Sequence, residues 1–313
     1  MTASDRGAIR IGTRGSPLAR TQTGHVVAAL SAAHPGVKFE LVIIRTSGDR
    51  ALRDVVGAFV KELQEALLCG AVDLAVHSFK DLPTERPDGL TIGAVPVRQD
   101  PRDAVLSPHG TFAMLPQGSR VGTGSARRAA QLRNLRPDLR FLPLVGNVDT
   151  RLRKLREGDY EAIVAALAGL RRLDLPISDG VLADTGMTVD LLEIDGFLPA
   201  PGQGALAIEC RSDDAYALDL IQPLDDPPSH VAVRAERAFL ARLGGGCQTP
   251  VAAYATVEGD VLRLRGLVAA IDGATIVRGE LTGATARPEA LGDALADRLA
   301  REGALALLQG APA

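Results

Sequence analysis

The sequence predicts an α/β protein with two similar lobes, followed by a smaller α+β domain. Three observations lead to this prediction. Apolar segments with strand character alternate with helical patterns through the first two thirds of the chain. A strand–turn–helix unit at 10–30 recurs at 120–135. After Pro227-Pro228 the pattern changes to one helix, three successive strands and a final helix.

The two lobes are expected to contain the same elements in the same order. In the first they are a strand at 10–14, a helix at 17–30, a strand at 39–45, a helix at 59–68 and a strand at 70–76. In the second they are a strand at 120–123, a helix at 126–135, a strand at 140–145, a helix at 150–156 and a strand at 158–164. Such alternation is typical of parallel sheets, whose ligands bind at the carboxyl ends of the strands. We therefore expect the site in a cleft between the lobes.

Two proline-containing segments, 96–101 and 199–204, are predicted to link the lobes. Two crossings resemble the plan of periplasmic binding proteins. The first lobe is predicted to comprise 1–97 and 203–222, the second 98–202, and the C-terminal α+β domain 223–313. The last domain should contain a helix at 231–243, strands at 251–257, 261–268 and 275–281, and a helix at 288–308.

The composition argues against several classes of protein, among them nucleic-acid-binding, membrane-spanning and disulfide-rich proteins. The net charge is −3 and aromatic residues make up 3% of the 313 residues, which argues against a nucleic-acid surface. No apolar run reaches the roughly 18 residues of a membrane span, and no secretory signal is visible. Three widely spaced cysteines argue against a disulfide framework, and no cluster has metal-ligand spacing. We expect a cytoplasmic protein with reduced thiols, no metal, and no nucleic-acid or membrane partner.

Cys247 lies in the glycine-rich segment Gly244-Gly245-Gly246-Cys247-Gln248-Thr249-Pro250, which is not typical of a hydrophobic core. Glycines leave the backbone free, so Cys247 should be accessible and movable, which suits covalent attachment of a ligand. The alternative is a small residue in a surface turn. Cys69 and Cys210 lie within apolar patterns and are predicted to be buried.

Arginines recur at predicted strand ends and helix starts: Arg14, Arg127 and Arg128 after Ser125, Arg151, and Arg171-Arg172. Each alone could be a surface charge, but together they predict a cationic cleft for a ligand with several carboxylates. A further strand runs into Ser78-Phe79-Lys80-Asp81. Asp81 beside Lys80 is either a plain ion pair or a group that stabilises a cation or moves a proton.

Seven segments together resemble one family: 12–19 (GTRGSPLA), 75–83 (AVHSFKDLP), 100–104 (DPRDA), 122–128 (GTGSARR), 146–151 (GNVDTR), 198–205 (LPAPGQGA) and 245–248 (GGCQ). The chain resembles the hydroxymethylbilane synthase family, also called porphobilinogen deaminase, along its whole length.

The resemblance implies a dipyrromethane cofactor joined by a thioether to Cys247. Four porphobilinogen molecules would be added head to tail with loss of ammonia, and hydrolysis would release a linear tetrapyrrole. We expect a monomer. The resemblance implies catalytic roles for Asp81 and Lys80. The implied cofactor-binding residues are Cys247, Ser78, Lys80, Asp81, Thr123, Ser125, Arg127, Arg128, Gly146 and Arg151. The implied substrate-binding residues are Arg14, Ser16, Phe59, Arg172 and Gln203.

The chain departs from the family pattern at two places. Val145 stands where the family usually has arginine, and the segment 50–59 lacks the usual Gly-Gly-Lys-Gly stretch. Two alternatives therefore stay open. One is a diverged relative with stalled or altered elongation that makes a shorter or different oligopyrrole. The other is a non-catalytic two-lobed binder of carboxylated pyrroles.

Overall fold

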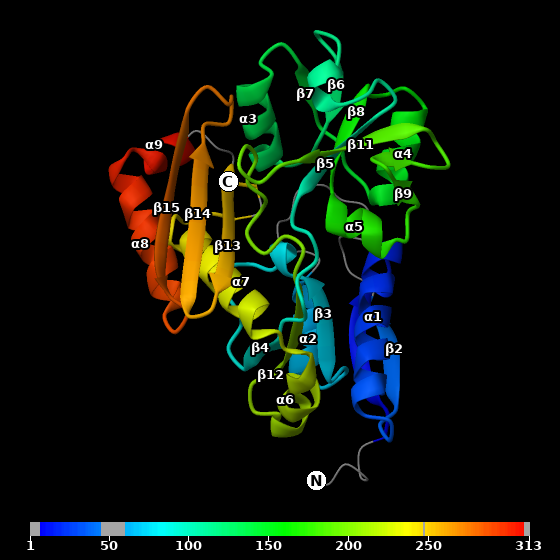
Figure 1. Ribbon diagram of the computed structural model, residues 1–313. Coiled ribbons are helices and arrows are strands. Elements are labelled where there is room, and N and C mark those ends of the chain that lie inside the picture. The colour runs from blue at the N-terminus through cyan, green and yellow to red at the C-terminus, as the bar shows by residue number, and fades with distance from the viewer. Residues whose placement is uncertain (1–6, 45–59, 247, 310–313) are drawn as a thin grey trace. The chain divides into compact units, whose positions relative to one another are not determined.

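The computed structural model describes residues 7–44, 60–246 and 248–309 (Figure 1). The chain forms two compact units, one of Met1–Arg98 with Ala205–His230 and the other of Gln99–Gly204 with Val231–Ala313. Each unit has its own sheet and core. The predicted α/β class is confirmed, while the finer division into three domains stays a prediction.

The first unit is built on a five-stranded sheet with the order β2-β1-β3-β12-β4. Its strands are β1 (Ile9–Arg14), β2 (Phe39–Ile44), β3 (Leu74–Ser78), β4 (Leu90–Ala94) and β12 (Leu206–Arg211). Its helices are α1 (Pro17–Ala33), α2 (Lys61–Leu68), α6 (Ala215–Ile221) and the short 3-10 helices η2 (Phe79–Asp81) and η4 (Gln222–Leu224). Strands β2, β1 and β3 are parallel, and β12 is antiparallel to both of its neighbours.

Helices cover both faces of this sheet because its strands are apolar on both sides. On one face Leu30 of α1 packs with Ile11 and Ile208 of the sheet. On the other face Leu63 and Leu67 of α2 form a second cluster with strand residues. The sheet therefore has a core on each side, which fixes the ends of its strands.

The second unit contains a seven-stranded sheet with the order β7-β6-β8-β5-β11-β10-β9. Its strands are β5 (Asp103–Ser107), β6 (Arg120–Gly122), β7 (Arg140–Leu142), β8 (Ala162–Ala166), β9 (Ile177–Ser178), β10 (Val181–Leu182) and β11 (Met187–Leu192). The helices beside it are η3 (Phe112–Met114), α3 (Ala126–Leu135), α4 (Val148–Arg156) and α5 (Leu167–Arg172).

The internal repeat is visible in the strand pairing of the two sheets. In each, the first strand of the repeat is parallel to the next two, and the third pairs with an antiparallel strand, β12 in one sheet and β5 in the other. The expectation of wholly parallel sheets was therefore wrong. Both antiparallel strands follow a linker segment directly, with no helix to return the chain to the opposite edge.

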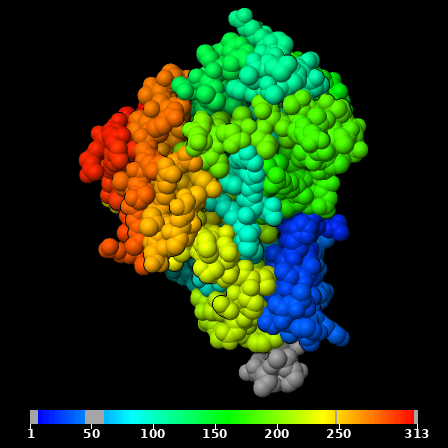
Figure 2. All heavy atoms as spheres, in the orientation of Figure 1, coloured from blue at the N-terminus to red at the C-terminus, as the bar shows by residue number. Residues whose placement is uncertain are grey.

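The last part of the second unit is an α+β layer pair with a three-stranded antiparallel sheet, β13 (Val251–Glu258), β14 (Val261–Ala269) and β15 (Ile276–Ala284). The accompanying helices are α7 (Pro227–Arg242), α8 (Pro288–Arg301) and α9 (Ala304–Leu308). Phe239, Leu264 and Leu295 lie in the core of this part, whose strands and last helices form an orange-to-red body in Figure 2. The single helix predicted at 288–308 is two helices, because Gly303 adopts a left-handed φ of 97°.

The two described cysteines differ from each other. Cys210 is buried on β12, as predicted, and burial raises the pKa of its thiol to about 11. Cys69 was predicted to be buried but is exposed, because it follows the last turn of α2. Among the described residues, no helix has the length and apolar character needed to cross a bilayer.

Candidate functional site

In the first unit, five of the predicted site residues follow two neighbouring parallel strands. Arg14 ends β1 and Ser16 caps α1, accepting a hydrogen bond from the Ala19 amide at 3.3 Å. Ser78 ends β3, and Lys80 and Asp81 lie in the 3-10 turn that follows it. Because β1 and β3 are parallel and paired, their carboxyl ends lie at the same edge of the sheet.

The turn after β3 is anchored through its first residue. Phe79 is buried and its amide donates to the Ala205 carbonyl at 3.1 Å. The Leu82 amide closes the turn on the Phe79 carbonyl at 3.2 Å. Lys80 is half-buried and Asp81 is exposed. The carboxylate of Asp81 is thus carried by a fixed backbone and is open to a ligand.

In the second unit, two helix starts lie at the ends of the neighbouring strands β6 and β7. Ser125 caps α3 by accepting from the Arg128 amide, and its own amide donates to Thr123 Oγ1 at 3.2 Å. Asn147 caps α4 by accepting from the Thr150 amide at 3.0 Å. Helix starts favour anions because their first N–H groups have no partner within the helix.

The turn before α4 requires glycine. Gly146 has a φ of 123°, and a Cβ atom there would lie 2.8 Å from Cγ2 of Thr150. The half-buried Arg151 donates from Nε to the Gly146 carbonyl at 2.7 Å, which fixes its guanidinium near the helix start. The preceding residue, Val145, is 66% exposed. A cation and a helix start therefore share this turn with an exposed apolar side chain.

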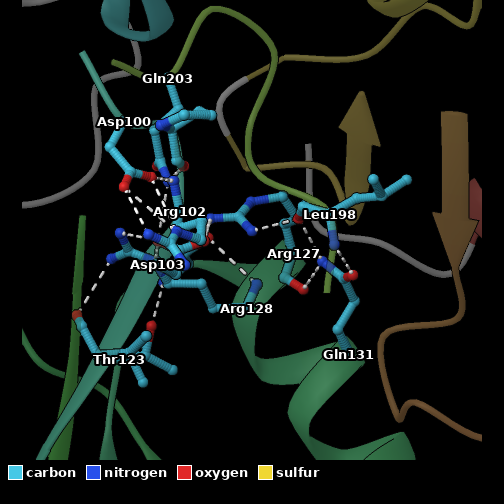
Figure 3. Close-up of polar contacts among 12 residues, drawn as sticks. Asp100, Arg102, Asp103, Thr123, Arg127, Arg128, Gln131, Leu198 and Gln203 are labelled. Atoms are coloured by element: carbon cyan, nitrogen blue, oxygen red, sulfur yellow. Dashed lines mark hydrogen bonds and ion pairs between the residues drawn. The ribbon is translucent and has the colours of Figure 1, made fainter. Parts of the chain in front are cut away.

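A buried carboxylate, Asp103, joins three of the predicted residues (Figure 3). Its Oδ2 atom lies 2.8 Å from Nη2 of Arg127. Its Oδ1 atom accepts from Nε and Nη2 of Arg128, at 2.9 and 2.6 Å. The Gln203 side-chain amide donates to the same Oδ1 at 3.0 Å and to the Pro101 carbonyl at 2.7 Å. Arg127, Arg128 and Gln203 are thus brought together, but their shared partner is the Asp103 carboxylate and not a bound ligand.

The rest of this cluster consists of backbone carbonyls and one aromatic ring. Arg127 donates to the Leu198 carbonyl at 2.8 Å and lies over the Phe197 ring, 5.5 Å from its centroid. Arg128 donates to the Val164 carbonyl at 3.2 Å. Gln131, on the next turn of α3, donates to the same Leu198 carbonyl and accepts from the Leu198 amide. The helix start is therefore tied to the segment that precedes the second linker.

The cluster carries more positive than negative charge. Arg127 and Arg128 share Asp103, while the buried Arg172 donates to the Gly204 carbonyl at 2.7 Å. Burial lowers the pKa of Arg127 and lowers that of Arg172 to about 10. Arginine nevertheless stays protonated at neutral pH. Two buried guanidinium groups on one carboxylate leave an excess of positive charge that favours an anionic ligand.

A second set of charges lies at the linker before β5. Asp100 pairs with Arg102 at 2.8 Å and with Arg171 at 3.6 Å, and Arg102 also reaches Glu193 at 2.6 Å. Burial opposes ionisation of Asp100, but the hydrogen bonds from Arg102 hold its pKa below the usual range. This network fixes the linker.

Two predicted residues, Phe59 and Cys247, lie outside the described residues. The neighbours of Cys247 are described. The Thr249 hydroxyl donates to the Gly246 carbonyl at 2.7 Å, and the Thr249 amide donates to the same oxygen at 3.1 Å. In the described part of the chain, no three His, Cys, Asp or Glu side chains form a group that could hold a metal ion.

The sequence interpretation did not assign Asp103 or Gln131 to the site. A signal for Asp103 was present, because an acidic residue opens the otherwise apolar segment Asp103-Ala104-Val105-Leu106. Such a residue needs a buried partner, and Arg127 and Arg128, which the sequence analysis assigned to the cofactor, supply it. Gln131 carried no comparable signal.

Comparison with known proteins identifies two family models in the chain. Residues 9–219 match "porphobilinogen deaminase, dipyromethane cofactor binding domain", and residues 230–301 match "porphobilinogen deaminase, C-terminal domain". A porphobilinogen deaminase from Roseiflexus sp. (strain RS-1) is 52% identical over 96% of this chain and 98% of its own length. That of Roseiflexus castenholzii is 51% identical over 97% of this chain and its whole length. Among solved structures, an arginine-specific periplasmic binding protein from Salmonella typhimurium is 13% identical, with a TM-score of 0.43, over 72% of this chain and 94% of that chain.

Proposed function

The chain belongs to the porphobilinogen deaminase family, and we propose that it joins four porphobilinogen molecules head to tail on a dipyrromethane cofactor attached to Cys247. Each addition forms one carbon–carbon bond and releases one ammonia, and hydrolysis then releases a linear tetrapyrrole. The family model that covers residues 9–219 is that of the cofactor-binding domain. A transferase is therefore favoured over the non-catalytic binder.

The residues of the second unit fit the cofactor by their chemistry. Each pyrrole ring carries an acetate and a propionate, so a dipyrromethane brings four carboxylates. The excess of buried positive charge of Arg127 and Arg128 over Asp103 is the observation that carries this assignment. Arg151 and the two helix starts offer donors that a carboxylate can contact directly.

We assign different roles to the arginines according to their burial. Arg127 and Arg128 are buried and bonded to Asp103, so they act mainly through their charge and by placing the start of α3. The half-buried Arg151 binds a cofactor carboxylate. Arg14 and Arg172 are assigned to the substrate or the growing chain. Thr123, Ser125 and Gly146 shape the turns that carry these groups.

The chemical step is assigned to Asp81. When bound, the cofactor supplies the attacking α-carbon of its terminal ring, so the chain needs no side-chain nucleophile. Loss of ammonia from porphobilinogen develops positive charge on the departing methylene carbon. The exposed carboxylate of Asp81 stabilises that charge and handles protons of the substrate, while Lys80 holds substrate carboxylates.

The test compares two carboxylates of one loop. Asp81→Asn keeps the shape and removes the charge, so the loaded protein should lose about 10²–10³-fold in turnover. Asp88→Asn changes an exposed carboxylate seven residues later and should leave turnover unchanged. Intact mass gives the loaded fraction, and ammonia release from porphobilinogen gives the rate. Near-normal turnover of Asp81→Asn would assign the step to another group.

We also propose that the protein acts as a cytoplasmic monomer without a nucleic-acid or membrane partner. The low aromatic content and small net charge support the absence of a nucleic-acid partner. Light scattering on the purified protein gives the mass of the particle, and a dimer mass would contradict the monomer.

A further inference from the structure

The first unit contains a buried polar cluster, Gln64–His77–Glu209, that the proposed reaction does not use. Oε2 of Glu209 lies 3.0 Å from Nε2 of His77. Gln64 donates from Nε2 to Oε1 of Glu209 at 3.0 Å. The Glu209 side chain is 0% exposed and that of His77 is 3% exposed. A buried carboxylate is costly unless it is paired and hydrogen-bonded. Here Gln64 hydrogen-bonds one oxygen, and the His77 imidazole lies within ion-pair distance of the other.

The strand pairing explains how these side chains meet. His77 on β3 faces Ala207 on β12, and Glu209 faces Ala75, so the two side chains form a diagonal pair on one face of the sheet. Gln64 comes from α2, which covers this face. The pairing of β12 with β4 shifts register between Ile208 and Glu209. Such irregularities re-aim a side chain, and this one occurs at the residue that forms the pair.

On the opposite face of the sheet, the next residue of β3, Ser78, also makes a side-chain hydrogen bond to a helix. The Ser78 hydroxyl donates to Oε1 of Gln22 at 3.1 Å, and Gln22 is a buried residue of α1. The last two residues of β3 are therefore fixed by polar contacts on both faces of the sheet. The turn that carries Lys80 and Asp81 follows immediately.

Stability alone does not explain why these buried side chains are polar. Replacing a buried ion pair with apolar side chains of similar volume is often neutral or stabilising. Hydrogen bonds and ion pairs, however, fix distance and direction, and a reactive group needs placement within roughly 0.5 Å. We propose that the Gln64–His77–Glu209 cluster positions the Phe79–Asp81 turn so that the Asp81 carboxylate has its reactive direction. This inference rests on the role assigned to Asp81, and the three residues are positioning residues.

The test compares two carboxylates that make contacts at β3. Glu209→Gln keeps the shape and replaces the carboxylate that lies 3.0 Å from His77, near the end of β3 that leads to Asp81. We expect kcat per loaded protein to fall about 10- to 100-fold, with KM within about twofold. Asp73→Asn is the matched control, because Asp73 precedes β3 and pairs with Arg10 at 3.0 Å. It should lower the melting temperature but leave kcat within about twofold.

Two further variants keep the inference testable. His77→Gln combined with Glu209→Gln should lose no more kcat than either single variant, because the pair acts as one unit. If Glu209→Gln does not fold, Gln64→Leu removes only the contact from α2 and should cause a smaller loss of kcat. Equal kcat losses in Glu209→Gln and Asp73→Asn, a rise in KM alone, or additive losses in the double variant would each overturn the proposal.

Hydrogen exchange separates this inference from the proposed function. The amides of Phe79 and Leu82 are bonded within the turn and its anchor, and their exchange does not require turnover. They should exchange faster in Glu209→Gln and at the native rate in Asp73→Asn. Failure of the native protein to consume porphobilinogen would refute the proposed function, whereas unchanged exchange in Glu209→Gln would refute the positioning role.

Discussion

Asp103→Asn is expected to be the most destabilising conservative substitution near the candidate site. The native carboxylate contacts Arg127 through one oxygen, and Arg128 and Gln203 through the other. If the asparagine oxygen takes the place of Oδ1 and accepts from Arg128 and Gln203, the NH₂ group takes the place of Oδ2 and faces Arg127. Two hydrogen-bond donors then face each other. Breaking a buried pair in this way costs about 3–5 kcal/mol. For a unit of this size the loss corresponds to about 6–20 °C in melting temperature.

The assay is thermal unfolding of Asp103→Asn beside Asp100→Asn. Asp100 is also bonded to arginines, but Arg102 and Arg171 are partly exposed, so its loss should be about 1 kcal/mol or less. Intact mass of both variants reports cofactor loading, which should fall for Asp103→Asn because α3 loses its anchor. A loss for Asp103→Asn no larger than that for Asp100→Asn would refute the argument from buried charge.

Three further predictions concern attachment, elongation and acid stability. Cys247→Ser should lack a covalent pyrrole and turnover, whereas Cys69→Ser should keep both; an adduct of unchanged mass on Cys247→Ser would contradict the attachment. Val145→Arg should speed the addition of successive rings about 10- to 100-fold, because one arginine–carboxylate contact contributes that much. The measurement is a mass-resolved time course, in which the native chain should accumulate intermediates. Equal clearance by both forms would show that another residue already supplies the contact. Arg120 lowers the pKa of Glu161 to about 2 from 4.5, so the stabilisation is complete above pH 4.5 and is lost as the pH falls toward 2. Glu161→Gln should therefore lose less melting temperature over that interval than the native chain, and parallel curves would count against the pair.

The local elements of the fold were predictable from the sequence because their signals are local. Ser16 and Ser125 each follow a strand and cap a helix, which gave both helix starts correctly. Gly146 marked the turn before α4. The exposure of Cys69 was missed because an apolar pattern does not show where the last helical turn ends.

The long-range partners were not predictable in the same way. Asp103 meets Arg128 and Gln203, which are 25 and 100 residues away along the chain. No periodicity relates such positions, and only the fold brings them together. The sequence predicted arginines that bind a ligand. The structure shows that two of them, Arg127 and Arg128, form ion pairs with the same buried carboxylate of the chain, Asp103.

The place of β12 in its sheet has a consequence for synthesis of the chain. This strand lies between β3 and β4, so both expose an unpaired edge until residues 206–211 have been made. At about 5–20 residues per second, the ribosome needs about 5–20 s to pass from the end of β4 to the start of β12. The strands of the seven-stranded sheet all lie within 103–192 and pair as they emerge. The sheet encoded second can therefore be completed before the sheet encoded first.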